Sequence, residues 1–219
     1  MKRLNLKLVL LMGVLAVLAG CATKSPLPKK DYTEFRKAHL SSILIVPVIN
    51  RSVDVDAPDY FLSTIARPLA ERGYYVYPIN LVKRVMEDDG LADANMVHGS
   101  DPMRLASLFG ADSVLYITIE RWDSKYAVFA TVTTVEMSYL LKSGATGQEL
   151  WKHKEVLAYD PTAGQNGLIA KAVAAAIEKA KPNYIPLARQ ANGAAVIRNG
   201  QGLPAGPFHP LYNADSVEF

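Results

Sequence analysis

The feature that most restricts the fold is a long alternating stretch in the second half of the chain. Residues 125–141 read KYAVFATVTTVEMSYLL. A period of two over such a length indicates a long β-strand with one buried face. The Gly-rich segment KSGATGQ and the run ELWKHKEVLAY follow, so residues 126–141 and 148–159 are predicted to form a hairpin. The positions expected on one face are Ala127, Phe129, Thr131, Thr133, Val135, Met137 and Tyr139.

Shorter patterns on both sides of the hairpin predict further strands and helices. The β-rich runs are SSILIVPVIN, in which Pro47 marks a strand end or an edge, GYYVYPIN and ADSVLYITIERWD. Helical spacing covers residues 59–72, 80–90, 101–110 and 164–181. We expect Asp59 and Asn80 as N-caps, and Pro68 to kink or split its helix. The order β-α-β-α-α-β-β-β-α predicts a single α/β domain with a mixed sheet.

The N-terminus has the layout of a secretory signal peptide. Three basic residues precede an apolar run over residues 8–19, and that run is shorter than the roughly 20 residues that a membrane-spanning helix needs. The run ends in LAGC, which resembles the lipobox of bacterial lipoproteins. The resemblance implies cleavage before Cys21 and acylation of its thiol and its new amino group. We therefore predict Cys21 as the lipid attachment residue, and several acyl chains make a stable anchor.

Loss of the leader changes the charge and the chemistry that the chain offers. Without Lys2, Arg3 and Lys7 the mature chain has 21 basic and 21 acidic residues, which gives no electrostatic footprint for nucleic acid. Cys21 is the single cysteine, so an intrachain disulfide is excluded, and a thiol at the end of a leader is not expected to be catalytic. The expected segments are a signal peptide (1–20), a lipidated tether (21–38), an α/β domain (39–181) and a Gly/Pro-rich C-terminal tail (182–219), either packed on the domain or partly mobile.

Patterns for catalysis, cofactors and metals are absent from the sequence. No phosphate-binding Gly-x-x-x-x-Gly-Lys-Ser/Thr and no Gly-x-Ser-x-Gly occur. The histidines lie far apart, without zinc-ligand spacing, at His39, His98, His153 and His209. Three acids in VDVDAPDY lack the central Gly and final Glu of an EF-hand. The acids of EDDG are expected to form a solvated helix end. We therefore predict no catalytic, cofactor-binding or metal-binding residues, and no enzyme.

Two motifs carry a resemblance to known envelope proteins. LASLFGADSVLYITI, residues 105–119, leads from a helix through Gly110 into a strand, and SGATGQELW forms the later turn. Together with ILIVPVIN and GYYVYP they resemble the periplasmic α/β domain shared by the TolB N-terminal domain and the curli secretion lipoprotein CsgG. From lipobox to tail, the chain resembles a family of bacterial lipoproteins of unassigned function that includes a neisserial surface vaccine-candidate antigen. The resemblance implies a lipoprotein that assists transport or assembly of other envelope components. Because Ala22 follows the cysteine, it also implies sorting to the outer membrane, facing the periplasm.

The hairpin argues against a pore. Its outward residues would include either Lys152 and Lys154 or His153 and Glu155, and a basic side chain facing lipid at mid-bilayer costs about 2–4 kcal/mol. We expect instead a non-enzymatic protein-binding module that uses an exposed edge strand and the C-terminal tail. Its partners would be the membrane through its lipid, and other envelope proteins or further copies of itself. The alternative is a small-ligand or enzymatic cleft at the carboxyl ends of the first strands, near Asn50, Arg51 and Asp54.

Overall fold

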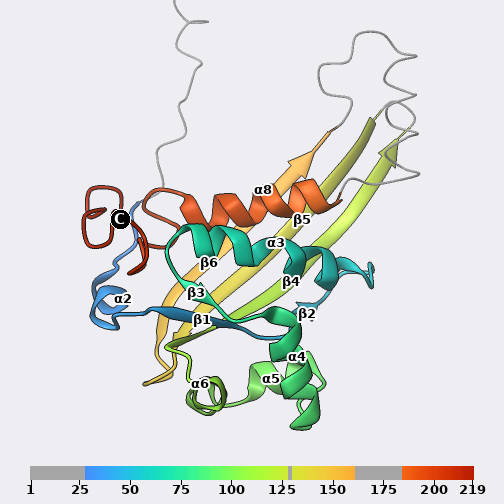
Figure 1. The fold of residues 1–219 in the computed structure, drawn as a ribbon. Coiled ribbons are helices and arrows are strands. Elements are labelled where there is room, and N and C mark those ends of the chain that lie inside the picture. Colours follow the sequence, from blue (N-terminus) through green and yellow to red (C-terminus); the bar gives the residue numbers. More distant parts are fainter. Residues whose placement is uncertain (1–27, 128–129, 161–183) are drawn as a thin grey trace, which may run out of the picture.

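The computed structural model of the chain describes residues 28–127, 130–160 and 184–219. Cys21, the signal peptide and the helix expected at 164–181 lie outside these residues. Figure 1 shows the fold. Its elements are α2 (Thr33–Lys37), β1 (Ser42–Ile45), β2 (Ile49–Asn50), α3 (Ala57–Glu71), β3 (Tyr75–Val76), α4 (Ile79–Asp88), α5 (Ala94–Gly99), α6 (Pro102–Phe109), β4 (Ser113–Ala127), β5 (Ala130–Ser143), β6 (Glu149–Tyr159) and α8 (Tyr184–Ile197).

All the strands join one mixed sheet, as the sequence predicts for an α/β domain. The order across the sheet is β3-β1-β4-β5-β6, with β2 paired to β4 beyond the end of β1. The pairs β1–β3, β1–β4 and β2–β4 are parallel. The pairs β4–β5 and β5–β6 are antiparallel, and the predicted hairpin is thus confirmed. A bulge between Ile119 and Arg121 shifts the register in β4.

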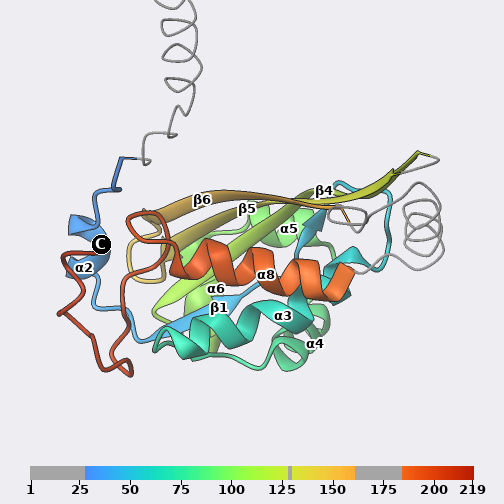
Figure 2. The same cartoon turned by 90° about the horizontal axis from the view of Figure 1, so that it is seen from above.

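Two apolar clusters hold helices against the two faces of the sheet. On one face, α3 and α8 lie side by side (Figure 2), and Ile43 and Ile45 of β1 point into their cluster. The neighbouring Leu44 and Val46 point to the other face, where they pack with residues of α4, α5 and α6. This alternation of four buried apolar residues explains why β1 reads as a continuous apolar run. We call the side of α3 and α8 the inner face and the opposite side the outer face.

Over β5 and β6 only the inner face is buried. The inner-facing Val135, Met137 and Tyr139 are each at most 1% exposed. On β6, Trp151, His153 and Glu155 are buried, whereas the side chains between them are exposed. Of the two sets predicted to face outward, the lysine set is therefore correct, and His153 and Glu155 point inward. The exposed outer residues of β6 are Lys152, Lys154, Val156 and Ala158.

Several predicted boundaries are wrong in ways that local chemistry explains. Pro68 lies within one continuous helix, α3, which begins at Ala57 rather than at an Asp59 cap. Pro68 is buried and its helix ends three residues later, so the packing of this turn outweighs one missing backbone hydrogen bond. Asn80 is inside α4, which begins after Pro78. The short helix α5 lies where no helix was predicted, and Asp93 caps it by accepting hydrogen bonds from two backbone amides.

The helix α6 has both predicted ends. Asp101 accepts a hydrogen bond from the backbone N–H of Met103, and Pro102 occupies the first turn. Gly110 closes the helix with φ 71°, a left-handed conformation that favours glycine. Asp112 follows directly, and its carboxylate accepts hydrogen bonds from the backbone amides of Ser41 and Ser42. The turn thereby aligns β4 with β1.

The tether and the tail were both predicted with the wrong limits. Tyr32 and Phe35, within the expected tether, are 4% and 5% exposed and belong to the inner apolar cluster. The expected tail contains α8, whose Ala188, Ala191 and Ala195 are fully buried. The folded domain therefore includes residues 28–38 and 184–219. Among the described residues, no helix combines the length and the apolar character needed to cross a membrane.

Candidate functional site

A buried ion pair joins the two ends of the domain. The Asp215 carboxylate accepts hydrogen bonds from Arg36 at 3.0 Å, from Arg72 at 2.9 Å and from the Ala205 amide at 2.6 Å. The Asp215 side chain is fully buried and that of Arg72 is 9% exposed. The Arg72 guanidinium also lies 4.5 Å from the centre of the Phe219 ring. One carboxylate thus links α2, the end of α3 and the C-terminal segment.

The start of the described chain is held against the first half of β6. Pro28 accepts a hydrogen bond from the Gln201 side chain at 2.6 Å, and the Lys30 amide donates to Gly200 at 2.9 Å. The Lys30 ammonium donates to the Lys152 carbonyl of β6 and to the Gln201 carbonyl, and lies 5.2 Å from the centre of the Trp151 ring. The chain that comes from Cys21 therefore enters the domain beside Lys152.

Raising the pH from 8 to 10 is expected to stabilise the protein through Lys30. Burial lowers the pKa of the Lys30 ammonium from 10.5 to about 8. Between these values the unfolded chain binds a proton that the folded chain has lost, so the free energy of unfolding rises with pH. Because Lys30 is only partly buried, we expect a gain of about 1 kcal/mol in urea unfolding. The Lys30→Met variant lacks the amine, and an equal pH dependence in both proteins would exclude this role of Lys30.

Beneath β6, a polar network fills the space between the sheet and α8. Glu155 accepts hydrogen bonds from Arg198 at 2.6 and 2.8 Å and lies 2.9 Å from His153 Nε2. Burial would raise the pKa of the Glu155 carboxyl, but the hydrogen bond from His153 and the Arg198 charge outweigh it, so this pKa is lowered. Nearby, the Tyr139 hydroxyl donates to Asn192 at 2.6 Å. These side chains satisfy one another's hydrogen-bonding groups, and none of them lines a described pocket. We therefore assign this network a role in the stability of the fold.

The second half of β6 is the free edge of the sheet. The Lys152 carbonyl faces away from β5, because it accepts its hydrogen bond from Lys30. By alternation, the backbone N–H and C=O groups of residues 154, 156 and 158 face the same way. In the part of the chain that the structure describes, β6 pairs with no strand on that side. Such a row of backbone donors and acceptors is a template for strand addition.

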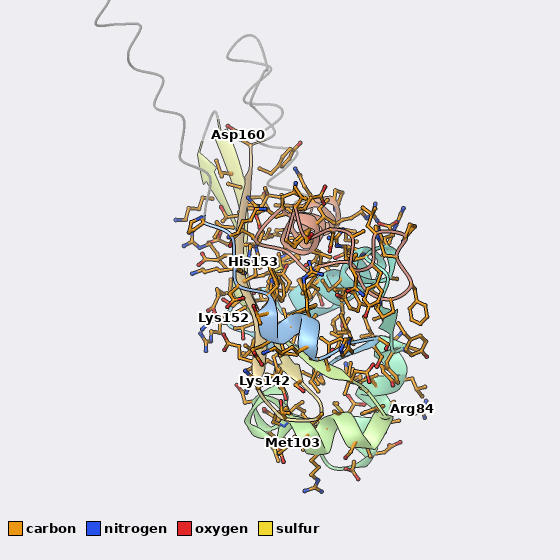
Figure 3. All side chains as sticks on the ribbon, turned by 90° about the vertical axis from the view of Figure 1, so that its left-hand side faces the viewer. Arg84, Met103, Lys142, Lys152, His153 and Asp160 are labelled. Atoms are coloured by element: carbon orange, nitrogen blue, oxygen red, sulfur yellow. The ribbon has the colours of Figure 1, made fainter. Side chains whose placement is uncertain are left out.

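Ion pairs order the outer face beside this edge. Glu136 on β5 contacts Lys154 of β6 at 2.6 Å and Arg121 of β4 at 3.4 Å. Glu120 accepts a hydrogen bond from Arg51 at 3.0 Å and another from Ser138 at 3.1 Å. Figure 3 places Lys142 and Lys152 along one flank of the molecule. The strands therefore present a polar surface, with exposed cations, next to the open edge.

The residues of the predicted cleft do not form a ligand site. The Asn50 side chain bonds within its own loop, to Ser52 and to the Asp54 carbonyl. Asp54 accepts from the Asp56 amide at 2.9 Å, and Arg51 is turned to Glu120 on the outer face. None of Asn50, Arg51 and Asp54 lines a described pocket. These side chains build a turn and do not line the pocket found at the carboxyl end of β1.

Hollows do occur elsewhere on the domain. A pocket of about 590 Å³ lies along α3, β3 and the start of α4, and a pocket of about 180 Å³ continues from it to the end of β1. Another of about 520 Å³ lies between α4 and α6. In that third pocket the hydroxyls of Ser100 and Ser107 donate to backbone carbonyls. The described residues of these pockets hold no serine bonded to a general base, and the described chain has no group of three or more potential metal ligands among His, Cys, Asp and Glu.

Sequence reasoning missed the residues that fix the β6 edge. Lys30 and Gln201 were assigned to a tether and a tail, and their contacts join residues more than a hundred positions apart. The only local pattern that indicates an ordered, packed segment before β1 is the pair Tyr32 and Phe35, whose spacing of three residues places them on one face of a helical turn.

Comparisons with known proteins agree with the fold. Residues 30–202 match the family described as "Putative lipoprotein GNA1162-like". The chain is 35% identical over 171 residues to "Putative lipoprotein NMB1124/NMB1162" of Neisseria meningitidis serogroup B, covering 78% of this chain and 80% of that protein. It is also similar to the crystal structure of lipoprotein GNA1162 from Neisseria meningitidis, with a TM-score of 0.54 and 34% identity, over 64% of this chain and 97% of that one. The chain therefore belongs to the GNA1162-like lipoprotein family.

Proposed function

We propose that the protein is an outer-membrane lipoprotein, anchored by lipid on Cys21, that faces the periplasm and acts as a non-enzymatic protein-binding module in envelope transport or assembly. The observation that carries the proposal is the edge of β6, which no other described strand covers from residue 154 onward. The leader and LAGC motif support the anchor. Membership of a lipoprotein family supports an envelope location.

Strand addition suits this edge for two physical reasons. An incoming extended segment would satisfy backbone groups that otherwise bind water, and alternate side chains would give specificity. The edge is also rigid, because β6 is paired along its length with β5 and packs on α8. A rigid edge loses little conformational entropy on binding. The partner would be an extended segment of another envelope protein or of a second copy of this chain.

In-cell photo-crosslinking tests the proposal. A photoreactive residue in place of the exposed Ala158 is expected to give a discrete crosslinked product in the intact envelope. The matched control is the same residue in place of Leu81 of α4, which is 58% exposed and lies away from β6. A product of twice the chain's mass would identify a second copy, and another mass would identify a different protein. Absence of any product at Ala158, with normal expression and fractionation, would contradict the proposal.

A further inference from the structure

The short connection to Cys21 restricts how the domain can lie relative to its membrane. Seven peptide units separate Cys21 from Pro28, and whatever their conformation they span at most about 25 Å. Pro28 is fixed to Gln201, and Lys30 to β6, so the connection ends beside Lys152. A lipid on Cys21 would thus hold the β6 side of the domain close to the lipid headgroups.

The surface at this place carries charge of the sign that anionic lipids attract. On the outer face of β4–β6, six basic side chains stand against four acidic ones, whereas in the rest of the described chain acidic side chains outnumber basic ones. Two of the acids, Glu120 and Glu136, already form ion pairs. The exposed Val156 lies on the same face. The basic residues are Arg51, Arg121, Lys125, Lys142, Lys152 and Lys154.

We propose that the outer face of β4–β6 docks on the anionic headgroups of the bilayer that carries the lipid of Cys21. This inference rests on the lipid anchor of the proposed function. The connection supplies a high effective concentration, so a modest electrostatic attraction is sufficient. Each basic residue near an anionic surface raises the ratio of docked to undocked protein by about fivefold at physiological salt. Docking leaves the backbone edge of β6 pointing along the membrane plane, where a partner strand can reach it.

Fluorescence quenching in vesicles tests the docking. The lipidated full chain with Val156→Cys has one free thiol, since the Cys21 thiol carries the lipid, and that thiol takes an environment-sensitive dye. The matched control is Ile197→Cys at the end of α8, next to the loop that holds Pro28. Their side chains are 52% and 58% exposed, on opposite faces of the sheet. The vesicles contain phosphatidylethanolamine and phosphatidylglycerol with brominated acyl chains, or neutral phosphatidylcholine with the same bromination.

We expect quenching at residue 156 but not at residue 197 in anionic vesicles, and little quenching at either residue in neutral vesicles. High salt, or Lys125→Gln together with Lys152→Gln, should lower the quenching at residue 156 with the protein still bound to the vesicles. Equal quenching at both residues, or none at 156 and at a second outer-face probe, Ala158→Cys, would overturn the docking. Failure of the protein to float with any vesicle would instead contradict the anchor, and the crosslink at Ala158 tests partner binding separately.

Discussion

Replacing Asp215 with alanine is expected to lower the free energy of unfolding by about 3–5 kcal/mol. The Asp215 side chain is fully buried and accepts hydrogen bonds from Arg36, Arg72 and the Ala205 amide. Its loss leaves the nearly buried Arg72 guanidinium without a counter-charge, and the desolvation of that guanidinium is then no longer offset. Urea unfolding followed by circular dichroism measures the change.

Two further variants serve as controls, one that removes only the charge at position 215 and one that removes an exposed acid nearby. Asp215→Asn keeps an acceptor for the Ala205 amide but removes the charge, and should lie between the wild type and Asp215→Ala. Glu218→Ala removes an exposed acid from the same segment and should change stability by less than about 0.5 kcal/mol. A loss below 1 kcal/mol for Asp215→Ala would show that the ion pair does not hold the C-terminal segment.

Proline at position 156 is expected to weaken partner binding by about 10- to 100-fold while the domain stays folded. The N–H of Val156 faces the free edge of β6, so its removal costs no hydrogen bond of the sheet. The complex would lose the hydrogen bond donated by the N–H of residue 156, and the carbonyl of the added strand that accepted it would stay unsatisfied. This weakens the binding free energy by about 1–3 kcal/mol. The yield of the crosslink at Ala158 measures the binding, and urea unfolding measures the fold.

The neighbouring position gives the matched control. Leu157 is paired with Val135 of β5, and its N–H faces that strand. Leu157→Pro should therefore destabilise the domain itself, and Val156→Thr, which keeps the donor, should retain the crosslink. If Val156→Pro unfolded the domain as strongly as Leu157→Pro, the assignment of the free edge would be wrong.

Regular local patterns were enough to predict some elements. The hairpin of β5 and β6 follows from a period of two, and α6 follows from a Pro at its start and a Gly at its end. Both signals act within a few residues of the backbone they determine. The helices α2 and α8 were missed because tertiary packing holds them rather than a strong apolar stripe. In α8, small buried alanines lie against the inner apolar cluster, and Pro186 and Gly193 weaken the helical pattern.

The candidate site shows the same division between local and long-range signals. The motif around Cys21 is local and predicts the lipid attachment directly. That β6 lies at an edge, and that Lys30 covers only its first half, depends on contacts between distant residues. The residues expected near a cleft, Asn50, Arg51 and Asp54, form hydrogen bonds within their own loop and with Glu120. Their residue types alone do not show these contacts.

Hydrogen exchange at the β6 edge tests most directly whether a partner strand adds to this edge. The amides of residues 154, 156 and 158 are compared in isolated outer membranes and in the detergent-purified protein. Strand addition predicts slow exchange at these amides in the membranes and fast exchange after purification, with the amides of residues 153, 155 and 157 protected in both. Fast exchange of residues 154, 156 and 158 in the membranes as well would contradict the central claim.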